Sequence, residues 1–326
     1  MDIDFVIPWV DGDDPHWISQ RNQYASGSET SDPCRFRDWD ILRYWFRAVE
    51  AHAPWVRRIF FVTCGQVPSW LNTHHPKLQL VNHLDYIPQE YLPTFSSHTI
   101  ELNLHRIPGL SEHFVYFNDD MFLNGPVVPE DFFLHGLPRD CAALDSPAPG
   151  TDVYACAQRN VIRCLNKHFN KQQTIKENPK LWFSPLYAKY AAKNLLFARG
   201  SEFTGIKNFH IPSSLCKSTF ERVWELAPQV LDETCRNRFR DRQDVNQYMM
   251  GYFQICTGAF KPRRADFGKC YRIELDQQKI RQDIRSGTHK VICINDHPGI
   301  TDFTEQKALL ISLFERRYPK KSSFEL

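Results

Sequence analysis

The sequence lacks the features that would place it among membrane-spanning or nucleic-acid-binding proteins. No apolar run approaches the roughly 20 residues of a spanning helix, and the densest run, Ile59 to Val62, has the length of a strand. The formal net charge is only +2, so a strongly basic surface is not expected and nucleic acid is excluded as the main partner. The ten cysteines include no CxxC pair, which favours reduced thiols in the cytosol.

Two further absences narrow the class. The first ten residues, MDIDFVIPWV, are acidic and lead directly into a strand, so we do not expect a secretory signal. We find no internal repeat and no low-complexity tract. A length of 326 residues with 42% hydrophobic residues suits one large domain or two fused lobes with an ample core. These properties indicate a globular cytosolic protein.

The segment that follows residue 114 is the most informative part of the chain. The run VYF at 115–117 predicts a buried strand, which ends abruptly in Asn118, Asp119 and Asp120. Two adjacent carboxylates repel each other, and a divalent cation that carries a diphosphate would offset this cost. Asparagine and aspartate also favour turns, so a solvated turn is the alternative. The pattern alone leaves a metal site and a turn open.

Strands and helices alternate in the first half of the sequence. Buried runs predict strands at 3–10, 59–63, 78–81 and 114–117, and helical spacing predicts helices at 41–53 and 97–106. This alternation indicates an α/β fold with a mainly parallel sheet, in which ligands bind beyond the carboxyl ends of the strands. That rule places three polar strand ends on one rim, namely Asp11 to Asp14, Gly65 with Gln66, and Asn118 to Asp120.

After about residue 145 the pattern becomes mostly helical. Helices are expected at 152–165, 185–196, 217–226, 244–257 and 305–318, with a short strand at 290–294. We therefore predict a donor-binding lobe at 1–145 and a mainly helical lobe at 146–326, which returns to the cleft near 290–298. The polar stretch 20–33 has the composition of a loop.

Several charged residues are candidates for binding an anionic ligand. Arg35 and Arg37 precede the first long helix, and arginine pairs bidentately with phosphate, so they are a plausible diphosphate clamp. Surface ion pairs with Asp38 or Asp40 are the alternative. Gly12 would let the backbone bend sharply and a ligand approach closely. The basic residues 316–321 leave a peripheral contact with anionic lipid open, although a solvated helix end is more common.

The second half contributes candidates for catalysis. His210 precedes Ile211 and Pro212, which force an extended backbone, so a general-base role is reasonable. Arg240 lies between two other arginines, at 238 and 242. The three would share a face in an extended segment and would fan out in a helix. Asn295 and Asp296 follow the strand at 290–294 as a second candidate metal site, with an ordinary turn as the alternative.

Two histidines, His98 and His105, stand seven residues apart on the helix expected at 97–106. This spacing would put both on one face, as metal ligands require. A packed or solvated histidine is more common, so we do not include them in the predicted site.

Long stretches of the chain resemble the Stealth family. The stretches IDFVIPWVDGDDPHW, RFRDWDILRYWFRAVEAHAPWVRRIFFVTCGQVPSWL and LPTFSSHTIELNLHRIPGLSEHFVYFNDDMF resemble its first two characteristic regions. The stretches FHIPSSLCKSTFERVWE and RFRDRQDVNQY look like the third, and ICINDH with the closing KKSSFEL looks like the fourth. The resemblance covers nearly the whole chain.

The resemblance implies a fold and a reaction. It implies a Rossmann-like core similar to that of GT-A glycosyltransferases, and transfer of a sugar 1-phosphate from a nucleotide sugar, usually a UDP-sugar, to a saccharide hydroxyl. The nucleoside monophosphate would leave, and Mg²⁺ or Mn²⁺ would assist. Because the chain is compact, it resembles the bacterial capsule and exopolysaccharide phosphotransferases of the family more than their animal relative. No prediction of the oligomeric state follows.

The resemblance also implies roles for individual residues. The resemblance assigns Asp11 and Arg35 to donor binding, and the patterns described above add Gly12, Arg37, Gln66 and Asn118. The expected metal ligands are Asp119, Asp120, Asn295 and Asp296. The expected catalytic residues are His210 as base or acceptor-orienting group, Arg240 as stabiliser of the phosphoryl charge, Asp244 as its orienting partner, and Asp120.

Two other functions remain as alternatives. A conventional metal-dependent GT-A glycosyltransferase would attack C1 of the sugar and release the nucleoside diphosphate. A catalytically silent carbohydrate-binding protein would need the strands and the aromatic core but not the acidic rim. The released nucleotide distinguishes the first alternative, and the absence of turnover distinguishes the second.

Overall fold

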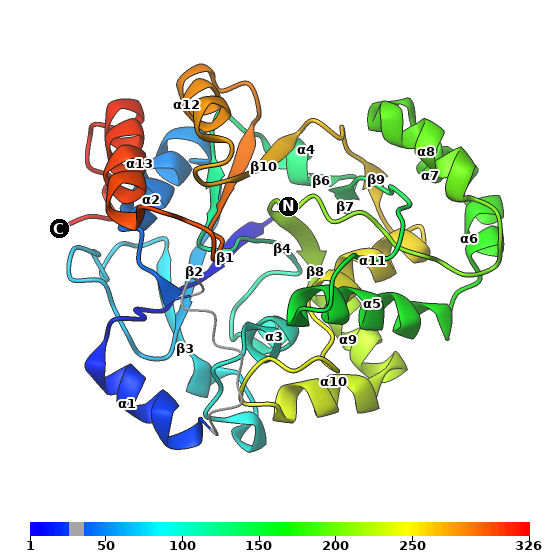
Figure 1. The fold of residues 1–326 in the computed structure, drawn as a ribbon, viewed down its shortest axis with the longest axis horizontal. Helices are drawn as coiled ribbons and strands as arrows, with labels where there is room; N and C mark the ends of the chain where they lie inside the picture. The colour runs from blue at the N-terminus through cyan, green and yellow to red at the C-terminus, as the bar shows by residue number, and fades with distance from the viewer. Residues whose placement is uncertain (26–35) are drawn as a thin grey trace.

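The structure is a computed structural model that describes residues 1–25 and 36–326 (Figure 1). Its main sheet has five strands in the order β3-β2-β1-β4-β8. These are β1 Ile3–Pro8, β2 Ile59–Thr63, β3 Leu78–Asn82, β4 His113–Tyr116 and β8 Ser213–Cys216. The first four run parallel, and β8 runs antiparallel to β4. The predicted α/β fold with a mainly parallel sheet is confirmed.

A second sheet begins where the chain leaves the first. It has the order β10-β11-β5, with β5 Met121–Leu123, β10 Gly268–Arg272 and β11 Val291–Asn295. β11 pairs parallel to β10 and antiparallel to β5. A third sheet joins the short strands β6 Phe133–Leu134, β7 Leu137–Asp140 and β9 Lys261–Pro262. Only four residues, 117–120, separate β4 from β5, so the Asn-Asp-Asp turn lies at the junction of the first two sheets.

The helices before residue 150 are α1 Pro15–Tyr24, α2 Leu42–His52, α3 Ser97–Leu102 and α4 Pro129–Phe132. They are followed by α5 Val153–Asn166, α6 Lys171–Glu177, α7 Pro179–Trp182 and α8 Lys189–Phe197. The last are α9 Lys217–Leu226, α10 Pro228–Arg236, α11 Tyr248–Cys256, α12 Gln277–Ser286 and α13 Phe303–Arg317.

Several sequence-based boundaries were wrong. The helix predicted at 97–106 ends at Leu102, and the helix predicted at 185–196 begins only at Lys189. Part of the loop predicted at 20–33 belongs to α1, which the side chain of Asp14 caps at His16 and which has proline at its first position. Ala25 follows α1, and residues 26–33 of that stretch lie outside the described residues. The helix predicted at 244–257 begins only at Tyr248, because the side chain of Asp244 accepts a hydrogen bond from the backbone of Asp241 and holds a loop there.

The main sheet separates two buried apolar clusters. Successive side chains of a strand point to opposite faces, so Val6 lies in one cluster while Phe5 and Ile7 lie in the other. The first cluster includes residues of α5, α9, α10 and α11, and the second includes residues of α2, α13 and the second sheet. Both clusters draw residues from either side of residue 145, and the two-lobe division stays a prediction.

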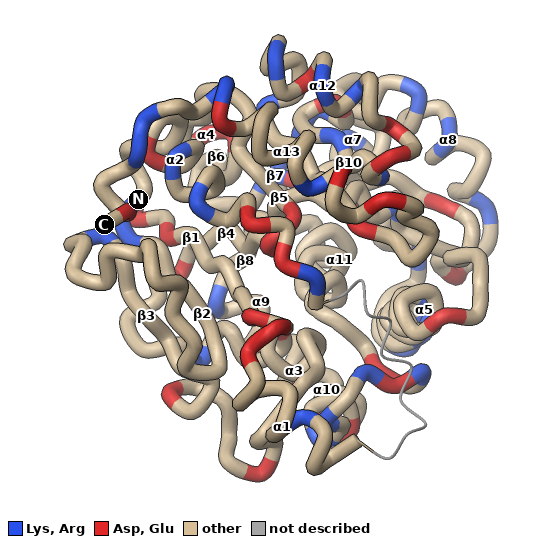
Figure 2. Tube along the Cα trace, turned by 60° about the vertical axis from the view of Figure 1, so that its left-hand side comes forward, with Lys and Arg blue, Asp and Glu red and all other residues tan. Residues whose placement is uncertain are grey.

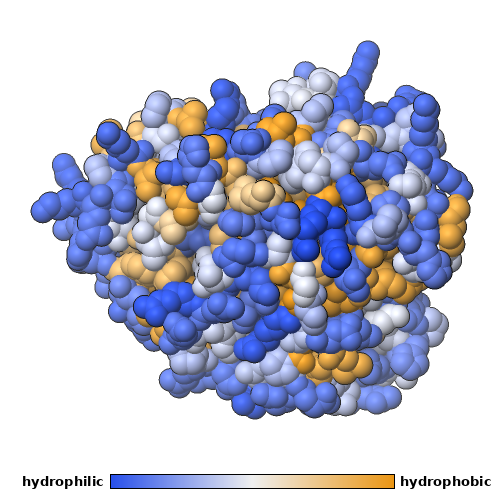
Figure 3. Space-filling view, turned by 180° about the vertical axis from the view of Figure 1, so that it is seen from behind, coloured by the Kyte–Doolittle hydropathy of each residue, from blue (hydrophilic) through white to orange (hydrophobic). Residues whose placement is uncertain are grey.

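The distribution of hydrophilic and hydrophobic residues on the surface is that of a globular protein. Seen from behind, it is largely hydrophilic, with hydrophobic residues in separate patches (Figure 3). None of the helices in the described ranges combines the length and the apolar character that crossing a membrane would require.

Candidate active site

Two of the three predicted rim loops are tied together by one side chain. The amide oxygen of Gln66 accepts from the backbone N–H of Asp11 at 2.9 Å, and its amide nitrogen donates to the Asp11 carbonyl at 3.0 Å. The same nitrogen donates to Oδ2 of Asp14 at 2.8 Å, which lowers the pKa of that carboxyl. The loop after β1 and the loop after β2 therefore form one fixed wall, as the strand-end rule predicts.

Gly12 is required at this wall by a close approach of the backbone. A Cβ at this position would lie 2.2 Å from the carbonyl oxygen of Phe36 and 2.6 Å from its Cβ. No larger residue fits without moving Phe36, whose ring lines the cavity described next. Gly12 therefore shapes the wall by leaving room for the backbone of Phe36.

A cavity of about 170 Å³ lies beside the carboxyl ends of β1 and β4. Its lining combines flat rings with charged groups. The rings belong to Trp9, Trp17, Phe36, Phe95, Tyr116 and Phe239, and the charged groups to Arg21, Glu101, Asp119 and Arg240. Nη2 of Arg240 donates to Oγ of Ser97 at 2.6 Å, which fixes the guanidinium at the N-terminus of α3. Aromatic walls with a few convergent charges suit a ligand that has both a planar ring and anionic groups.

Asp119 lines this cavity. Its side chain is exposed to solvent, while protein surrounds the cavity on its other sides. Burial within that surrounding protein and the neighbouring charge of Asp120 raise the pKa of Asp119 to about 7, while Arg240 opposes the shift. The two carboxylates thus resist carrying two full charges at neutral pH. This is the electrostatic cost that the sequence of the turn predicts.

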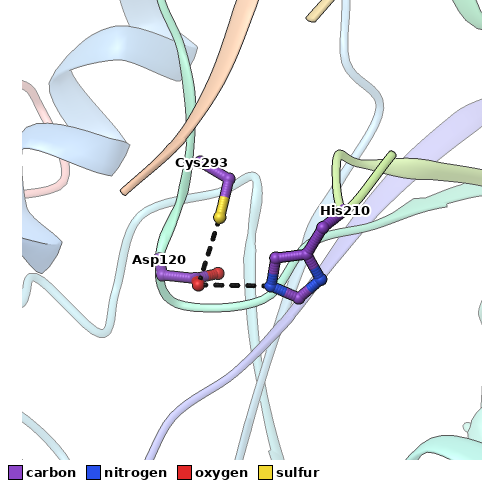
Figure 4. A group of neighbouring side chains, drawn as sticks. All are labelled: Asp120, His210 and Cys293. Carbon is purple, nitrogen blue, oxygen red and sulfur yellow. Dashed lines mark hydrogen bonds and ion pairs between the residues drawn. The ribbon is translucent and has the colours of Figure 1, made fainter. Parts of the chain in front are cut away.

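Asp120 forms a cluster on the other side of the turn (Figure 4). Its Oδ2 lies 3.4 Å from Nε2 of His210 and accepts from Nδ2 of Asn295 at 3.1 Å and Sγ of Cys293 at 3.2 Å. Burial acts to raise the pKa of Asp120. The charge of His210 and the hydrogen bonds from all three neighbours outweigh burial, so the pKa is lowered. Three segments distant in sequence meet at this one oxygen.

His210 is held from both ring nitrogens. Its Nδ1 lies 2.8 Å from the hydroxyl of Tyr248 on α11, opposite the contact with Asp120. Its backbone has φ of 49°, in the left-handed region, and its N–H donates to Oδ1 of Asn208 at 2.7 Å. Burial acts to lower the pKa of His210, but the carboxylate of Asp120 raises it above its ordinary value. The carboxylate of Asp120 therefore stabilises the imidazolium form of His210.

The chemistry of the turn fits a hard divalent cation. Oδ1 of Asp120 and Oδ1 of Asn118 are buried and have no hydrogen-bond partner among the described residues. Together with the carboxylate of Asp119 they offer oxygen ligands of the kind that Mg²⁺ prefers. Ligand atoms of Asp120, His210 and Cys293 also lie within 4.8 Å of one another, and this nitrogen and sulfur set suits softer metals. The residues present can thus hold a metal ion at Asp120 from either side.

Two residues predicted to bind different groups instead contact each other. Nη1 of Arg37 lies 3.4 Å from Oδ1 of Asp296, and Nε1 of Trp39 donates to Oδ2 at 3.1 Å. Burial raises the pKa of Asp296, and Arg37 opposes this shift. Among the described residues, no hydrogen bond links Asp296 to either carboxylate of the turn. Arg35 lies outside the described residues.

Asp244 is fully buried and lies behind the site. Its oxygens accept from Nδ1 of His98 at 2.9 Å, from the amide of Asn237 at 2.8 Å and from the backbone N–H of Asp241 at 2.8 Å. These contacts brace the loop 237–244 that carries Arg240. We infer that Asp244 acts on Arg240 through this loop and does not contact a ligand.

Sequence reasoning missed two neighbours of the central pair, Cys293 and Tyr248. Cys293 could have been found from the sequence, because residues two apart on a strand share a face and Asn295, two residues further on, was already a candidate. The second had none, because the contact of Tyr248 with His210 joins residues 38 positions apart through the packing of α11.

Comparison with known families and sequences gives consistent matches. Models of three conserved regions of Stealth proteins match the chain: region 1 at residues 1–29, region 2 at 35–139 and region 4 at 282–326. The capsular polysaccharide phosphotransferase WcwK of Streptococcus pneumoniae is 39% identical over 99% of this chain and 98% of its own length. The exopolysaccharide phosphotransferase cps2G of Lactiplantibacillus plantarum is 42% identical over 100% and 96%. The receptor polysaccharide phosphotransferase WefC of Streptococcus oralis is 37% identical over 99% of both.

Solved structures also show similarity over most of the chain. The galactosyltransferase LgtC, in complex with donor and acceptor sugar analogues, has 11% identity and a TM-score of 0.38, with 94% of this chain and 95% of that one covered. Mouse xyloside xylosyltransferase 1 has 10% identity and a TM-score of 0.38, with 90% and 98% covered.

Proposed function

This chain belongs to the Stealth family, and from that premise we propose that it transfers a sugar 1-phosphate from a UDP-sugar to a saccharide hydroxyl. The product is a phosphodiester, and uridine monophosphate leaves. We further propose that the acceptor is a growing capsular or extracellular polysaccharide and that the reaction takes place in the cytoplasm. The names of the relatives support the polysaccharide phosphotransferase activity.

One arrangement carries the proposal. The cavity with aromatic walls and Arg240 ends at Asp119, and the next residue, Asp120, belongs to the cluster with His210. A nucleotide base between the rings would direct its diphosphate toward the turn. The phosphorus that bears the sugar would then lie between Arg240 and the imidazole, where an acceptor hydroxyl can approach from the side of His210.

The proposed reaction is a direct displacement at phosphorus. The acceptor oxygen forms a bond to the phosphorus attached to the sugar, while the bond from that phosphorus to the oxygen bridging to the nucleoside phosphate breaks. The hydroxyl proton passes to Nε2 of His210 in its neutral form, and the carboxylate of Asp120 stabilises the imidazolium that results. Tyr248 keeps the ring oriented at Nδ1. C1 of the sugar does not react, so its anomeric configuration is retained.

The remaining residues supply binding and charge. Arg240 neutralises negative charge on the transferring phosphoryl oxygens, where a preorganised cation contributes strongly. Asn118, Asp119 and Asp120 would hold Mg²⁺ or Mn²⁺, which supplies further charge neutralisation when bound. Asn295 turns its amide nitrogen toward Asp120, so we assign it to orienting that carboxylate. Arg37 and Asp296 hold each other at the edge of the site.

The test is to identify both products of one reaction. We would incubate the purified protein with a panel of UDP-sugars, Mg²⁺ or Mn²⁺ and oligosaccharide acceptors. Phosphorus NMR should show a phosphodiester, and chromatography should show uridine monophosphate. Release of uridine diphosphate with a phosphorus-free product would instead establish a conventional glycosyltransferase. No release with any donor would support a silent binding protein.

A matched pair of variants links the reaction to the site. Arg240→Lys keeps the charge but loses the planar fork, so we expect turnover to fall by about a hundredfold. Arg242→Lys changes an exposed residue of the same loop, outside the cavity lining, and should retain wild-type turnover. Equal losses in both variants would argue against a role of Arg240 at the phosphoryl group.

A further inference from the structure

Helix α8 exposes two leucines and buries an asparagine. The side chains of Leu195 and Leu196 are 66% and 74% exposed, whereas Asn194 is completely buried. The amide of Asn194 donates to the carbonyls of Ala142 and Trp182, and its oxygen accepts from the N–H of Leu144 at 2.6 Å. These bonds fix the rotation of the helix, so the leucines are directed to the outside.

The end of α8 is held equally firmly. Lys171 at the start of α6 is buried, and its ammonium donates to the carbonyl oxygens of Phe197 at 2.8 Å and Arg199 at 2.6 Å. A cation at this position satisfies carbonyls that the helix C-terminus leaves free. The two leucines therefore stand on a rigid, braced helix at the edge of the molecule (Figure 1).

The same corner carries an excess of positive charge. Residues 163–202 contain eight Lys or Arg and two Glu, a net charge of +6. The whole chain carries +2, so the rest of it carries −4. Lys and Arg positions gather around α8 in Figure 2. Six exposed cations of this segment form no ion pair with any residue that the structure describes: Arg163, Lys167, Lys176, Lys180, Lys189 and Arg199.

We propose that this corner, formed by α6 to α8, binds the surface of an anionic lipid bilayer. Leu195 and Leu196 would enter the interface between headgroups and acyl chains, and the surrounding cations would contact the headgroups. Exposed apolar side chains within a basic surface are the combination that such peripheral binding uses. The proposal does not depend on the reaction proposed above.

The charge distribution argues for a lipid surface in particular. The cations lie on α6, α7, α8 and the adjoining loops, so they cover a broad area and do not converge on a point. A bilayer presents negative charge over a broad area together with an apolar layer beneath it. The basic residues at 316–321 are placed differently: Arg316 and Arg317 form the last turn of α13, and Lys321 beyond it donates to the carbonyl oxygen of Leu326.

The experiment is vesicle flotation of the full-length protein. The wild type should float with vesicles of mixed phosphatidylcholine and phosphatidylglycerol, and far less with phosphatidylcholine alone. Leu195→Ser with Leu196→Ser should weaken binding at least about tenfold. The matched control is Leu84→Ser with Leu275→Ser, which changes two leucines that are 67% and 60% exposed elsewhere. This control should bind like the wild type.

A second pair of variants tests the charge. Lys180→Gln with Lys189→Gln should weaken binding by about twenty-fivefold, since each cation near an anionic surface contributes roughly fivefold. Lys320→Gln with Lys321→Gln removes the same charge at the other basic segment and should have little effect. Thermal unfolding of all variants confirms that each one is folded.

Three outcomes would overturn the proposal. The wild type fails to float with anionic vesicles at physiological salt; the leucine variant binds as well as its control; or the wild type is an oligomer in solution that the leucine variant dissociates. The last result would assign the corner to contacts between copies of the chain.

Discussion

Two of the carboxylate–imidazole pairs in this molecule occupy different regions, and they differ in their spacing and in which carboxylate oxygens have partners. Asp120 lies beside His210 at the turn between the two main sheets, and Asp244 lies beside His98 in the interior. Both pairs join segments far apart in sequence, and both aspartates are predicted site residues. The N···O distance is 3.4 Å in the first pair and 2.9 Å in the second.

The difference lies in which oxygens have partners. Oδ1 of Asp244 accepts from Asn237 and Oδ2 accepts from His98 and Asp241, so both oxygens are used within the fold. Asp120 accepts three bonds at Oδ2 and none at Oδ1. A buried polar atom without a partner is costly unless a ligand completes it. The comparison assigns the Asp244 pair to structure and the Asp120 pair to ligand binding.

The strongest test of this contrast is Asp120→Asn. We expect turnover to fall about a thousandfold or more, because the change removes the charge beside both His210 and the proposed cation. The free energy of unfolding should change by less than about 1 kcal/mol, since asparagine keeps the shape and the repulsion with Asp119 disappears. Nucleotide release and urea denaturation measure the two effects separately.

A suitable control for this variant is Asp131→Asn. Asp131 also pairs with a cation, Lys290, at 2.6 Å, but it lies outside the cavity lining and the Asp120 cluster. The Asp131→Asn variant should turn over as fast as the wild type. Activity of Asp120→Asn within tenfold of the wild type would remove Asp120 from the proposed mechanism.

The opposite result is expected for Asp244→Ala. This change leaves three donors without an acceptor, including the buried ring nitrogen of His98, so we expect the free energy of unfolding to fall by about 3 kcal/mol. Asp266→Ala is the comparison, because Asp266 pairs with the exposed Arg264, where an ion pair contributes little. Urea denaturation should separate the two variants clearly. If Asp244→Ala kept its stability and lost turnover, the predicted catalytic role would be favoured over the structural one.

Much of the fold could be predicted because its strands are continuous buried runs. β2 was found with its observed bounds, since all five of its residues are buried and apolar or β-branched. β5 could not be found as a strand, because it has three residues and pairs with β11, about 170 positions away. α1 was missed because Trp17 is its only buried side chain, so it has little apolar periodicity.

The site was predictable where one short segment carries the information. The Asn118–Asp120 turn follows directly from a strand that ends in carboxylates, and Gln66 follows from the strand-end rule. Pairings across the fold were not predictable. Arg37 meets Asp296 over a separation of 259 residues, and many other arginines and aspartates in the chain offered equally reasonable partners.

The smallest expected effect concerns the imidazole of the Asp120–His210 pair. His210 has a second partner, the hydroxyl of Tyr248, at its other ring nitrogen. Tyr248→Phe removes that hydrogen bond and leaves the ring free to turn. We expect kcat to fall about threefold to tenfold, the value of one hydrogen bond. KM for the donor should be unchanged, because Tyr248 does not line the donor cavity.

Tyr252→Phe provides the matched control on the same helix, one turn further along. Its hydroxyl is also buried, but it donates to the carbonyl of Ile206 at 3.0 Å. Both variants lose one buried hydrogen bond, so both should lose similar stability, and only Tyr248→Phe should lose kcat. Equal kcat values in the two variants would show that orientation of His210 does not limit the reaction. In that case the open oxygen of Asp120 would be the feature that separates the two pairs.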